Sequence, residues 1–442
     1  MVGAASLQGI AVIRGTLAGV AAAFAMAGGA GAQEVPAATP YDAAVFAKAK
    51  ELQPKVVTWR RDFHEHPELS NSEVRTAKIV ADHLRKLGFE VRTGVGKTGV
   101  VGILKGAKPG KVVALRADMD ALPVAEQTGL PFASKVTAQY NGQTVPVMHA
   151  CGHDSHVAIL MGAAEILAGM KDQIEGTVVF IFQPAEEGPP PGEEGGAPLM
   201  VKEGVLKNPK VDAIFGLHAF PGPVGMTVWR PGPMMAASDR FEIELKGKQA
   251  HGSMPWQGID MSSLTADIVT AFNQITSRQI NVSKTPTVLT ISTLHGGLRY
   301  NIIPEDMTMT GTLRTFDPGM RTDVMARADK AVASITERYG ASGKINWGQP
   351  NPVTDNNRAL SAQMKPTLAR AAQGQIADDI DYIMGAEDFS YFQKEVPGFF
   401  YHLGVGFPKG GNHSPFFDVD ERAMEVGVRA QALLALDYLK GE

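Results

Sequence analysis

The sequence has 442 residues and a single cysteine, Cys151, so it cannot form an internal disulfide. It also lacks a strong charge of either sign, because 42 basic and 46 acidic residues leave a net charge of −4. A balance so close to neutral gives no indication of binding to nucleic acid or to an anionic membrane surface. The apolar stretch over residues 15–27 is shorter than the ~20 residues that a membrane-spanning helix needs.

The first 32 residues differ in composition from the rest of the chain. Arg14 precedes the apolar stretch, and Ala30-Gly31-Ala32 matches the small-x-small pattern at which signal peptides are cleaved. We predict a signal peptide over residues 1–32, a periplasmic or secreted protein, and no membrane association after cleavage. An Ala/Gly-rich tail without structure is the alternative. Export does not require a disulfide, because a core of this size is stable without one.

The pattern of apolar residues predicts an α/β fold. The length exceeds the ~250–300 residues at which single cores stop growing, so we expect more than one domain. Three apolar runs are continuous, as in strands that are buried on both faces; they cover residues 112–115, 178–182 and 213–217. Helical patterns alternate with them and cover residues 41–69, 72–87 and 156–170. This alternation predicts a mostly parallel mixed sheet with helices on both faces.

From about Ser238 the pattern changes. Residues 240–246 and 307–314 alternate strictly between apolar and polar, as half-buried antiparallel strands do. Helical patterns over 262–276 and 321–339 complete a strand–helix–strand–strand–helix order. We therefore predict an inserted α+β domain. The predicted organisation is a signal peptide (1–32), a catalytic domain in two parts (41–235 and 349–442) and the insert (236–348).

The most informative cluster is His149-Ala-Cys-Gly-His-Asp-Ser-His156, which places three imidazoles and a carboxylate around the only thiol. Cys151 could serve as a small buried residue, a nucleophile or a metal ligand. The imidazoles favour the metal, because thiolate and neutral imidazole are preferred ligands of zinc. His156 opens the following helical pattern, and we expect it to be structural.

Polar residues follow each of the three buried strands, which is where open α/β sheets place their sites. One of these segments contains the adjacent pair Glu186 and Glu187. In a turn both side chains can border one pocket, so that one binds a metal while the other takes a proton from water. Taken alone, such a pair is more typical of a solvated turn.

Four motifs in this order resemble the amidohydrolase branch of the M20 metallopeptidases: His-Ala-Cys-Gly-His-Asp, Gln-Pro-Ala-Glu-Glu-Gly, Gly-Leu-His-Ala and a late His-Ser-Pro. This branch includes hippurate hydrolases, auxin-conjugate hydrolases and N-acyl-amino-acid amidohydrolases. The resemblance extends from about Trp59 to the C-terminus. It implies a zinc-exopeptidase-like catalytic domain with two divalent ions, of which zinc suits the sulfur and nitrogen ligands and manganese, cobalt or nickel are alternatives. The ligands that it implies are Cys151, His153, Glu187, His218 and His413.

The resemblance also implies roles for residues outside this ligand set. Glu186 is the expected general base, His251 the expected donor to the oxyanion, and Asn301 with Arg314 the expected site for the substrate carboxylate. Without the motif, His251 would be a surface histidine, Asn301 a turn residue and Arg314 a solvated strand residue. Three aspartates are expected to orient the metal ligands without binding the ions; they are Asp118, Asp120 and Asp154. Trp256 stands where the family commonly has histidine, which leaves one pocket wall undefined.

The expected function is hydrolysis of the amide bond of a small N-acyl amino acid, with a hippurate-like aromatic acyl group as one possibility, by metal-activated water. One rival is a metallodipeptidase or carboxypeptidase with the same machinery. Another is an inactive periplasmic binding protein, which Glu186 argues against because a binder needs no base. The resemblance alone implies that the insert serves as a lid or dimerisation domain and that the protein forms a homodimer or higher homo-oligomer.

Overall fold

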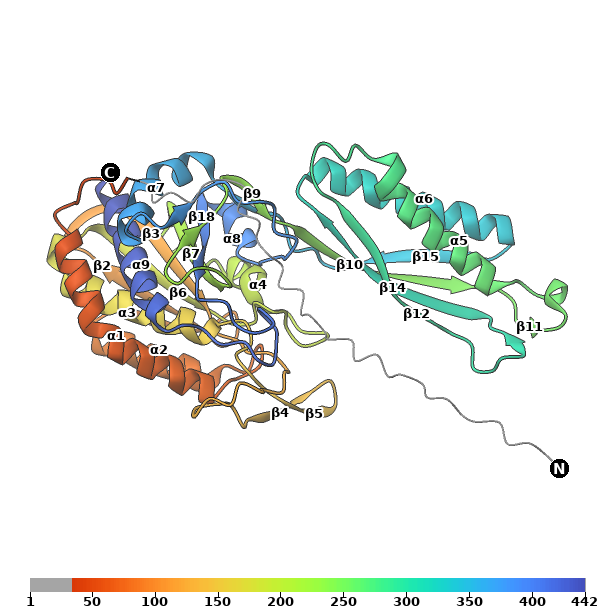
Figure 1. Ribbon diagram of the computed structural model, residues 1–442, viewed down its shortest axis with the longest axis horizontal. Helices are drawn as coiled ribbons and strands as arrows, with labels where there is room; N and C mark the ends of the chain where they lie inside the picture. The colour runs from red at the N-terminus through yellow and green to blue at the C-terminus, as the bar shows by residue number, and fades with distance from the viewer. Residues whose placement is uncertain (1–33, 442) are drawn as a thin grey trace, which may run out of the picture. The chain divides into compact units, whose positions relative to one another are not determined.

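The computed structural model describes residues 34–441, and the predicted signal peptide at 1–32 falls outside them (Figure 1). Across residues 34–441, no helix is both long enough and apolar enough to cross a membrane.

The larger sheet has eight strands in the order β1-β2-β6-β3-β7-β18-β8-β17 (Figure 1). β6, β3, β7 and β18 pair in parallel at its centre, whereas β1 and β2 add antiparallel strands at one edge. The three predicted apolar runs are parts of β3, β6 and β7. The strands are β1 (Glu90–Val95), β2 (Gly99–Lys105), β3 (Lys108–Asp118), β6 (Glu175–Gln183), β7 (Ala213–Phe220), β8 (Thr227–Val228), β17 (Ile376–Ala377) and β18 (Gly398–Gly404).

Helices cover both faces of this sheet, which confirms the predicted fold class. On β2, Gly102 faces Leu84 of α2, whereas Gly99 faces Met200 of α4, so these two helices lie on opposite faces. α3 and α9 contact β3 and each other, and α1 packs against both of them. The helices are α1 (Asp42–Glu65), α2 (Val74–Lys86), α3 (His153–Gly169), α4 (Gly196–Lys202), α7 (Arg358–Ala371), α8 (Ser390–Glu395) and α9 (Arg422–Lys440).

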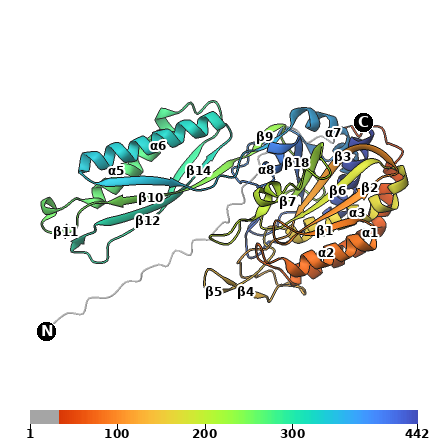
Figure 2. The same cartoon turned by 180° about the vertical axis from the view of Figure 1, so that it is seen from behind.

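A second sheet has the order β12-β14-β10-β15, with α5 and α6 packed on one face around a separate hydrophobic core (Figure 2). Alternating burial along β10 confirms the predicted half-buried strand. β15 was not predicted, because its Gly343 and polar residues weaken the apolar alternation. The domain boundaries at 236 and 348 stay predictions. The elements are β10 (Ala237–Lys246), α5 (Met261–Gln274), β12 (Val288–Gly296), β14 (Asp306–Thr315), α6 (Pro318–Tyr339) and β15 (Ser342–Trp347).

β12 is an edge strand of this second sheet, and large apolar side chains on it and on the loop that follows are exposed. Leu294 is 51% exposed, Leu298 104% and Tyr300 94%. An edge strand presents unpaired backbone groups that can pair with another chain. This edge therefore combines hydrogen-bonding capacity with an apolar surface.

Three short ladders complete the fold. The first is the hairpin of β4 (Thr137–Tyr140) and β5 (Gln143–Pro146). In the second, β9 (Gly232–Met235) pairs with β16 (Thr354–Asn356). The third joins β11 (Ala250–His251) to β13 (Ile302–Ile303) within the insert.

Candidate active site

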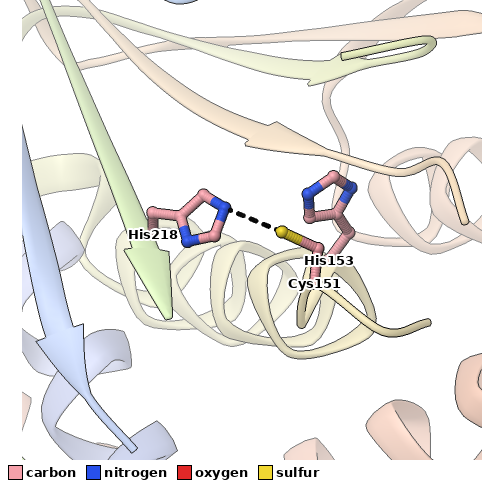
Figure 3. Close-up of side chains that lie close together, drawn as sticks. All are labelled: Cys151, His153 and His218. Atoms are coloured by element: carbon pink, nitrogen blue, oxygen red, sulfur yellow. Dashed lines mark hydrogen bonds between the residues drawn. The ribbon is translucent and has the colours of Figure 1, made fainter. Parts of the chain in front are cut away.

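Cys151 lies immediately before α3, next to the carboxyl end of β7 (Figure 3). Gly152, with φ of 94°, turns the chain into the helix, and a Cβ there would lie 3.0 Å from Ala219 Cβ. Only glycine adopts this backbone conformation at little cost. The helix consequently begins at His153, three residues before the predicted start, so that Cys151 and His153 both lie at its N-terminal end.

Five side chains assemble into two groups of potential metal ligands that share Cys151. The Cys151 Sγ lies 3.3 Å from His218 Nε2 and 3.3 Å from His413 Nε2, and His413 Nε2 lies 3.0 Å from Glu187 Oε1. The ligand atoms of Cys151, His153 and His218 lie within 4.8 Å of one another, and so do those of Cys151, Glu187 and His413. The structure thus brings together all five residues predicted as ligands, with the thiol common to both groups.

Hydrogen bonds fix the tautomers of two of these histidines. Nδ1 of His153 donates to the Asp120 carbonyl oxygen at 2.8 Å, and Nδ1 of His218 donates to that of Ala219 at 2.7 Å. In the neutral ring each Nε2 then carries the lone pair, which is the form in which imidazole binds a metal. His153 Nε2 is buried and accepts no hydrogen bond from residues 34–441. This donor set fits divalent ions.

Glu186 and Glu187 follow β6 in a tight turn in which Ala185 has a φ of 52°. The Asp120 carboxylate accepts hydrogen bonds from both backbone amides, at 3.1 Å from Glu186 N and 3.0 Å from Glu187 N. Both side chains border one cavity as a result. Burial and the nearby carboxylates of Glu387, Glu187 and Asp388 raise the pKa of Glu186 well above its ordinary value.

The three predicted orienting aspartates are buried, and each holds a different part of the site. Asp120 connects the His153 ring to the glutamate turn, as described. Asp118 accepts from Arg116 at 2.7 Å and from His156 at 2.5 Å, while His156 Nε2 accepts the amide of Ala219 at 2.7 Å. His156 is therefore committed to structural hydrogen bonds.

Asp154 holds the base of α3 against α1. Its carboxylate accepts from Arg60 and from His64, each at 2.8 Å, and all three side chains are at most 1% exposed. Arg60 and His64, together with Asp418 and Glu421 near α9, extend this ion network away from the ligand groups. The network anchors the segment that carries His153.

His413 reaches the site from a loop after β18. It has a φ of 66°, and its amide donates to the Ala150 carbonyl oxygen at 2.7 Å. The Asn412 side chain donates to the carbonyl oxygens of Cys151 and Ala219, each at 3.2 Å. The His413 side chain is 56% exposed, unlike the buried His153.

A cavity of about 740 Å³ contains four of the five ligands together with Glu186. Arg314 lines it as well; burial lowers the pKa of this guanidinium, and no salt bridge within residues 34–441 involves it. Apolar parts of the wall come from Leu199, Phe220, Met235, Ile383 and Tyr391.

His251 and Asn301 do not line this cavity. They lie beside each other in the insert, where the Gly252 amide donates to the Asn301 carbonyl oxygen at 2.9 Å and His251 pairs with Ile302. His251 is exposed, and its Nδ1 accepts the Ser253 amide at 3.1 Å. Of the three residues predicted to contact the substrate from the insert, only Arg314 lines the cavity.

Sequence reasoning gave no role to two buried groups. Arg116 bonds Gln183 at 2.8 Å and Glu387 at 2.9 Å, and so supplies one positive charge beneath several carboxylates. An arginine at the end of an otherwise apolar strand is a signal that could have identified it. His402 lines the cavity in contact with Phe220, and burial lowers its pKa to about 3, so that its ring stays neutral. No local pattern marks His402, because its position depends on the pairing of β18 with β7.

The sequence and fold are similar to those of known hydrolases. Residues 114–437 match the family model described as peptidase family M20/M25/M40. The chain is 42% identical to thermostable carboxypeptidase 1 of Saccharolobus solfataricus, over 88% of this chain and 96% of that protein. It is 37% identical to an N-acetylcysteine deacetylase of Bacillus subtilis, over 88% and 98%. A solved structure from Bacillus subtilis, a dinuclear metal-binding peptidase of the M20 family, is 36% identical with a TM-score of 0.74, over 88% and 99% of the two chains. The ligand groups and these likenesses together place the chain in the peptidase family M20/M25/M40 of metal-dependent amidohydrolases and peptidases.

Proposed function

We propose that the protein hydrolyses the amide bond of N-acyl amino acids to a carboxylic acid and a free amino acid. The observation that carries this proposal is the content of one cavity. It is lined by four of the five ligands in the two groups that share Cys151, by the carboxyl of Glu186 and by the unpaired guanidinium of Arg314. A substrate with an amide bond next to a carboxylate matches this combination, because Arg314 can bind the carboxylate while Glu186 is beside the ligand groups.

The chemistry divides between the ions and Glu186. Divalent ions held by the two groups would lower the pKa of water and polarise the amide carbonyl, and the thiolate and imidazole ligands favour zinc. Glu186 takes a proton from the attacking water and delivers it to the nitrogen of the departing amino acid. Its raised pKa supports this role, because it makes Glu186 a stronger base than an ordinary carboxylate and so better able to take the proton from water.

His251 and Asn301 remain proposed contacts for the oxyanion and the carboxylate. Since neither lines the cavity, their roles require a state in which the β11–β13 ladder reaches the substrate. Closure of a lid over the substrate is a common way to complete a catalytic site and exclude water.

We propose an apolar acyl group, benzoyl included, because five apolar or aromatic side chains contribute to the cavity wall. They are Leu199, Phe220, Met235, Ile383 and Tyr391. The most direct test compares hippurate with N-acetylglycine, which differ only in the acyl group, and with phenylalanylglycine, which carries a free amine. We expect zinc- or manganese-loaded protein to cleave hippurate with kcat/KM about 10-fold or more above N-acetylglycine, since filling an apolar pocket is worth about 10–200-fold. Phenylalanylglycine should also be cleaved more slowly than hippurate, because its charged amine is costly to place against an apolar wall.

Preferred cleavage of phenylalanylglycine would instead assign a dipeptidase or carboxypeptidase. Absence of turnover on all three substrates after metal loading would refute hydrolysis of this substrate class. Protein treated with a chelator and assayed on the same substrates provides the metal-free control.

We also propose that β12 pairs with β12 of a second copy to form a homodimer. Its free edge and the exposed Leu294, Leu298 and Tyr300 support this proposal, because exposed apolar patches of this kind mark interaction sites. We expect the wild-type protein to sediment at twice the mass of one chain. Introducing charge with Leu294→Lys and Tyr300→Lys together should shift it to the monomer.

Val282→Lys is the matched control, because Val282 is 67% exposed in the same insert but lies outside β12. A wild-type monomer, or a double variant that still sediments as the dimer, would contradict pairing at this edge.

A further inference from the structure

Three polar side chains form one row across neighbouring chain segments at the base of the insert. Arg314 on β14 pairs with Ser238 on β10, and Ser238 in turn forms an antiparallel bridge with Asn351. The amides of Ser238 and Asn351 each donate to the carbonyl oxygen of the other at 2.9 Å. Residues directly opposite in antiparallel strands point to the same face, with Cβ atoms about 4.5–5.5 Å apart. The side chains of Arg314, Ser238 and Asn351 therefore extend from neighbouring positions on one face.

This row faces the cavity that holds Cys151 and Glu186, because all three residues line it. The next residue along β10, Asp239, points to the opposite face, where Arg321 binds it at 2.8 and 2.6 Å. Asp239 therefore forms its salt bridge with Arg321, and Arg314 has no carboxylate partner in a salt bridge within residues 34–441. Within the same residues, Ser238 and Asn351 form hydrogen bonds only through their backbones. The row offers three unused polar groups to a ligand in the cavity.

The chemistry of the row suits a carboxylate. The guanidinium presents N–H donors in a planar fork, and the hydroxyl and carboxamide add further donors. None of the three side chains carries a negative charge. Charge-assisted hydrogen bonds of an arginine to a carboxylate are stronger than neutral ones, and additional donors fix the orientation of the bound group.

We propose that Ser238 and Asn351 complete, with Arg314, the site that binds the substrate carboxylate. This inference rests on the proposed function, since it is the N-acyl amino acid that supplies the carboxylate. Ser238 lies where the chain leads into the insert and Asn351 where it leaves, so a bound carboxylate contacts both connecting segments. Binding of the carboxylate therefore depends on the relative position of the two segments that connect the insert to the rest of the chain.

The test compares each N-acyl amino acid with its primary carboxamide, which keeps the acyl group and side chain but removes the negative charge. Ser238→Ala and Asn351→Ala should each lower kcat/KM for the acid about 10-fold, mainly through KM, because each removes a hydrogen bond to a charged group. On the carboxamide both variants should stay within about two-fold of the wild type. Ser238→Thr, which keeps the hydroxyl, should restore activity on the acid.

Gln349→Ala is the matched control. Gln349 lines the same cavity two residues before Asn351, but its side chain donates to the Tyr391 hydroxyl at 3.4 Å. It should therefore show no selective loss on the acid. An equal loss on acid and carboxamide in the Ser238 and Asn351 variants, or no loss on the acid, would overturn the assignment.

Calorimetry separates this inference from the proposed function. The affinity for hippurate (N-benzoylglycine) is measured with zinc-loaded Glu186→Gln protein and with the Glu186→Gln, Asn351→Ala double variant. No turnover is needed for this measurement. About 10-fold weaker binding with Asn351→Ala supports the carboxylate site even if no amide is hydrolysed. Equal binding overturns the site even if hydrolysis is demonstrated.

Discussion

Glu186→Gln is expected to lower kcat by about 10²–10⁴-fold while the protein keeps its full complement of metal, since proton transfer by a positioned side chain contributes that much. Glutamine preserves the size of the side chain and its ability to accept the Asp388 amide, which lies 3.5 Å from Glu186 Oε1. It cannot accept a proton from water. The carboxylate of Glu186 lies within 4.8 Å of ligand atoms of His153 and Glu187, but Glu186 belongs to neither group that shares Cys151. Because the five ligands of those two groups are unchanged, the ions should stay bound.

The measurement combines steady-state kinetics on the cleaved N-acyl amino acid with metal analysis by mass spectrometry. Glu194→Gln is the control, because Glu194 lines the same cavity but is exposed and paired with Lys202 at 2.8 Å. Its kcat should stay close to that of the wild type. Retained activity in Glu186→Gln would remove this residue from the proton-transfer role, and loss of metal would show that it is a ligand.

Cys151→Ser is expected to lose metal before it loses anything else. The thiol is common to both ligand groups, so its removal weakens both ion sites at once. Burial and the neighbouring Glu187 raise the pKa of the Cys151 thiol, so that bound cations are needed to hold it as the thiolate. A serine hydroxyl is far harder to deprotonate. We expect metal affinity to fall by at least 100-fold, above the 10–100-fold that loss of an outer hydrogen-bond partner costs.

Metal content after dialysis and thermal unfolding with and without zinc provide the readouts. The wild type should be stabilised by zinc and the variant should not, while the two metal-free proteins unfold at similar temperatures. A Cys151→Ser protein with full metal content and no activity would instead identify the thiol as a nucleophile.

The fold could be predicted where burial leaves a clear trace in the sequence. Strands covered on both faces must be continuously apolar, which is why the runs in β3, β6 and β7 were recognisable. The ligands could be anticipated as a group, because the polar segments after these strands meet at one edge of the sheet. Gly152 illustrates the limit: its left-handed conformation starts α3 at His153, and the helical pattern alone placed the start at His156.

The remaining site residues depend on tertiary contacts. Asp120 joins the His153 ring, 33 residues away in the sequence, to the glutamate turn, 66 residues away, and no spacing in the sequence encodes these contacts. Ser238 and Asn351 are neighbours only because the segment that enters the insert pairs with the segment that leaves it. For His251 the local sequence motif predicts a catalytic contact, but His251 does not line the cavity. Whether His251 reaches the substrate depends on the position of the insert, which the local sequence does not encode.

The paired backbone hydrogen bonds between Ser238 and Asn351 also have a consequence for how the insert could be gained or lost during evolution. They bring together the two points at which the insert joins the larger domain, and the insert has its own hydrophobic core. A segment whose two ends meet can be gained, lost or exchanged as a cassette without reordering the strands of the host sheet. The larger domain would then need only a short turn from residue 237 to residue 352.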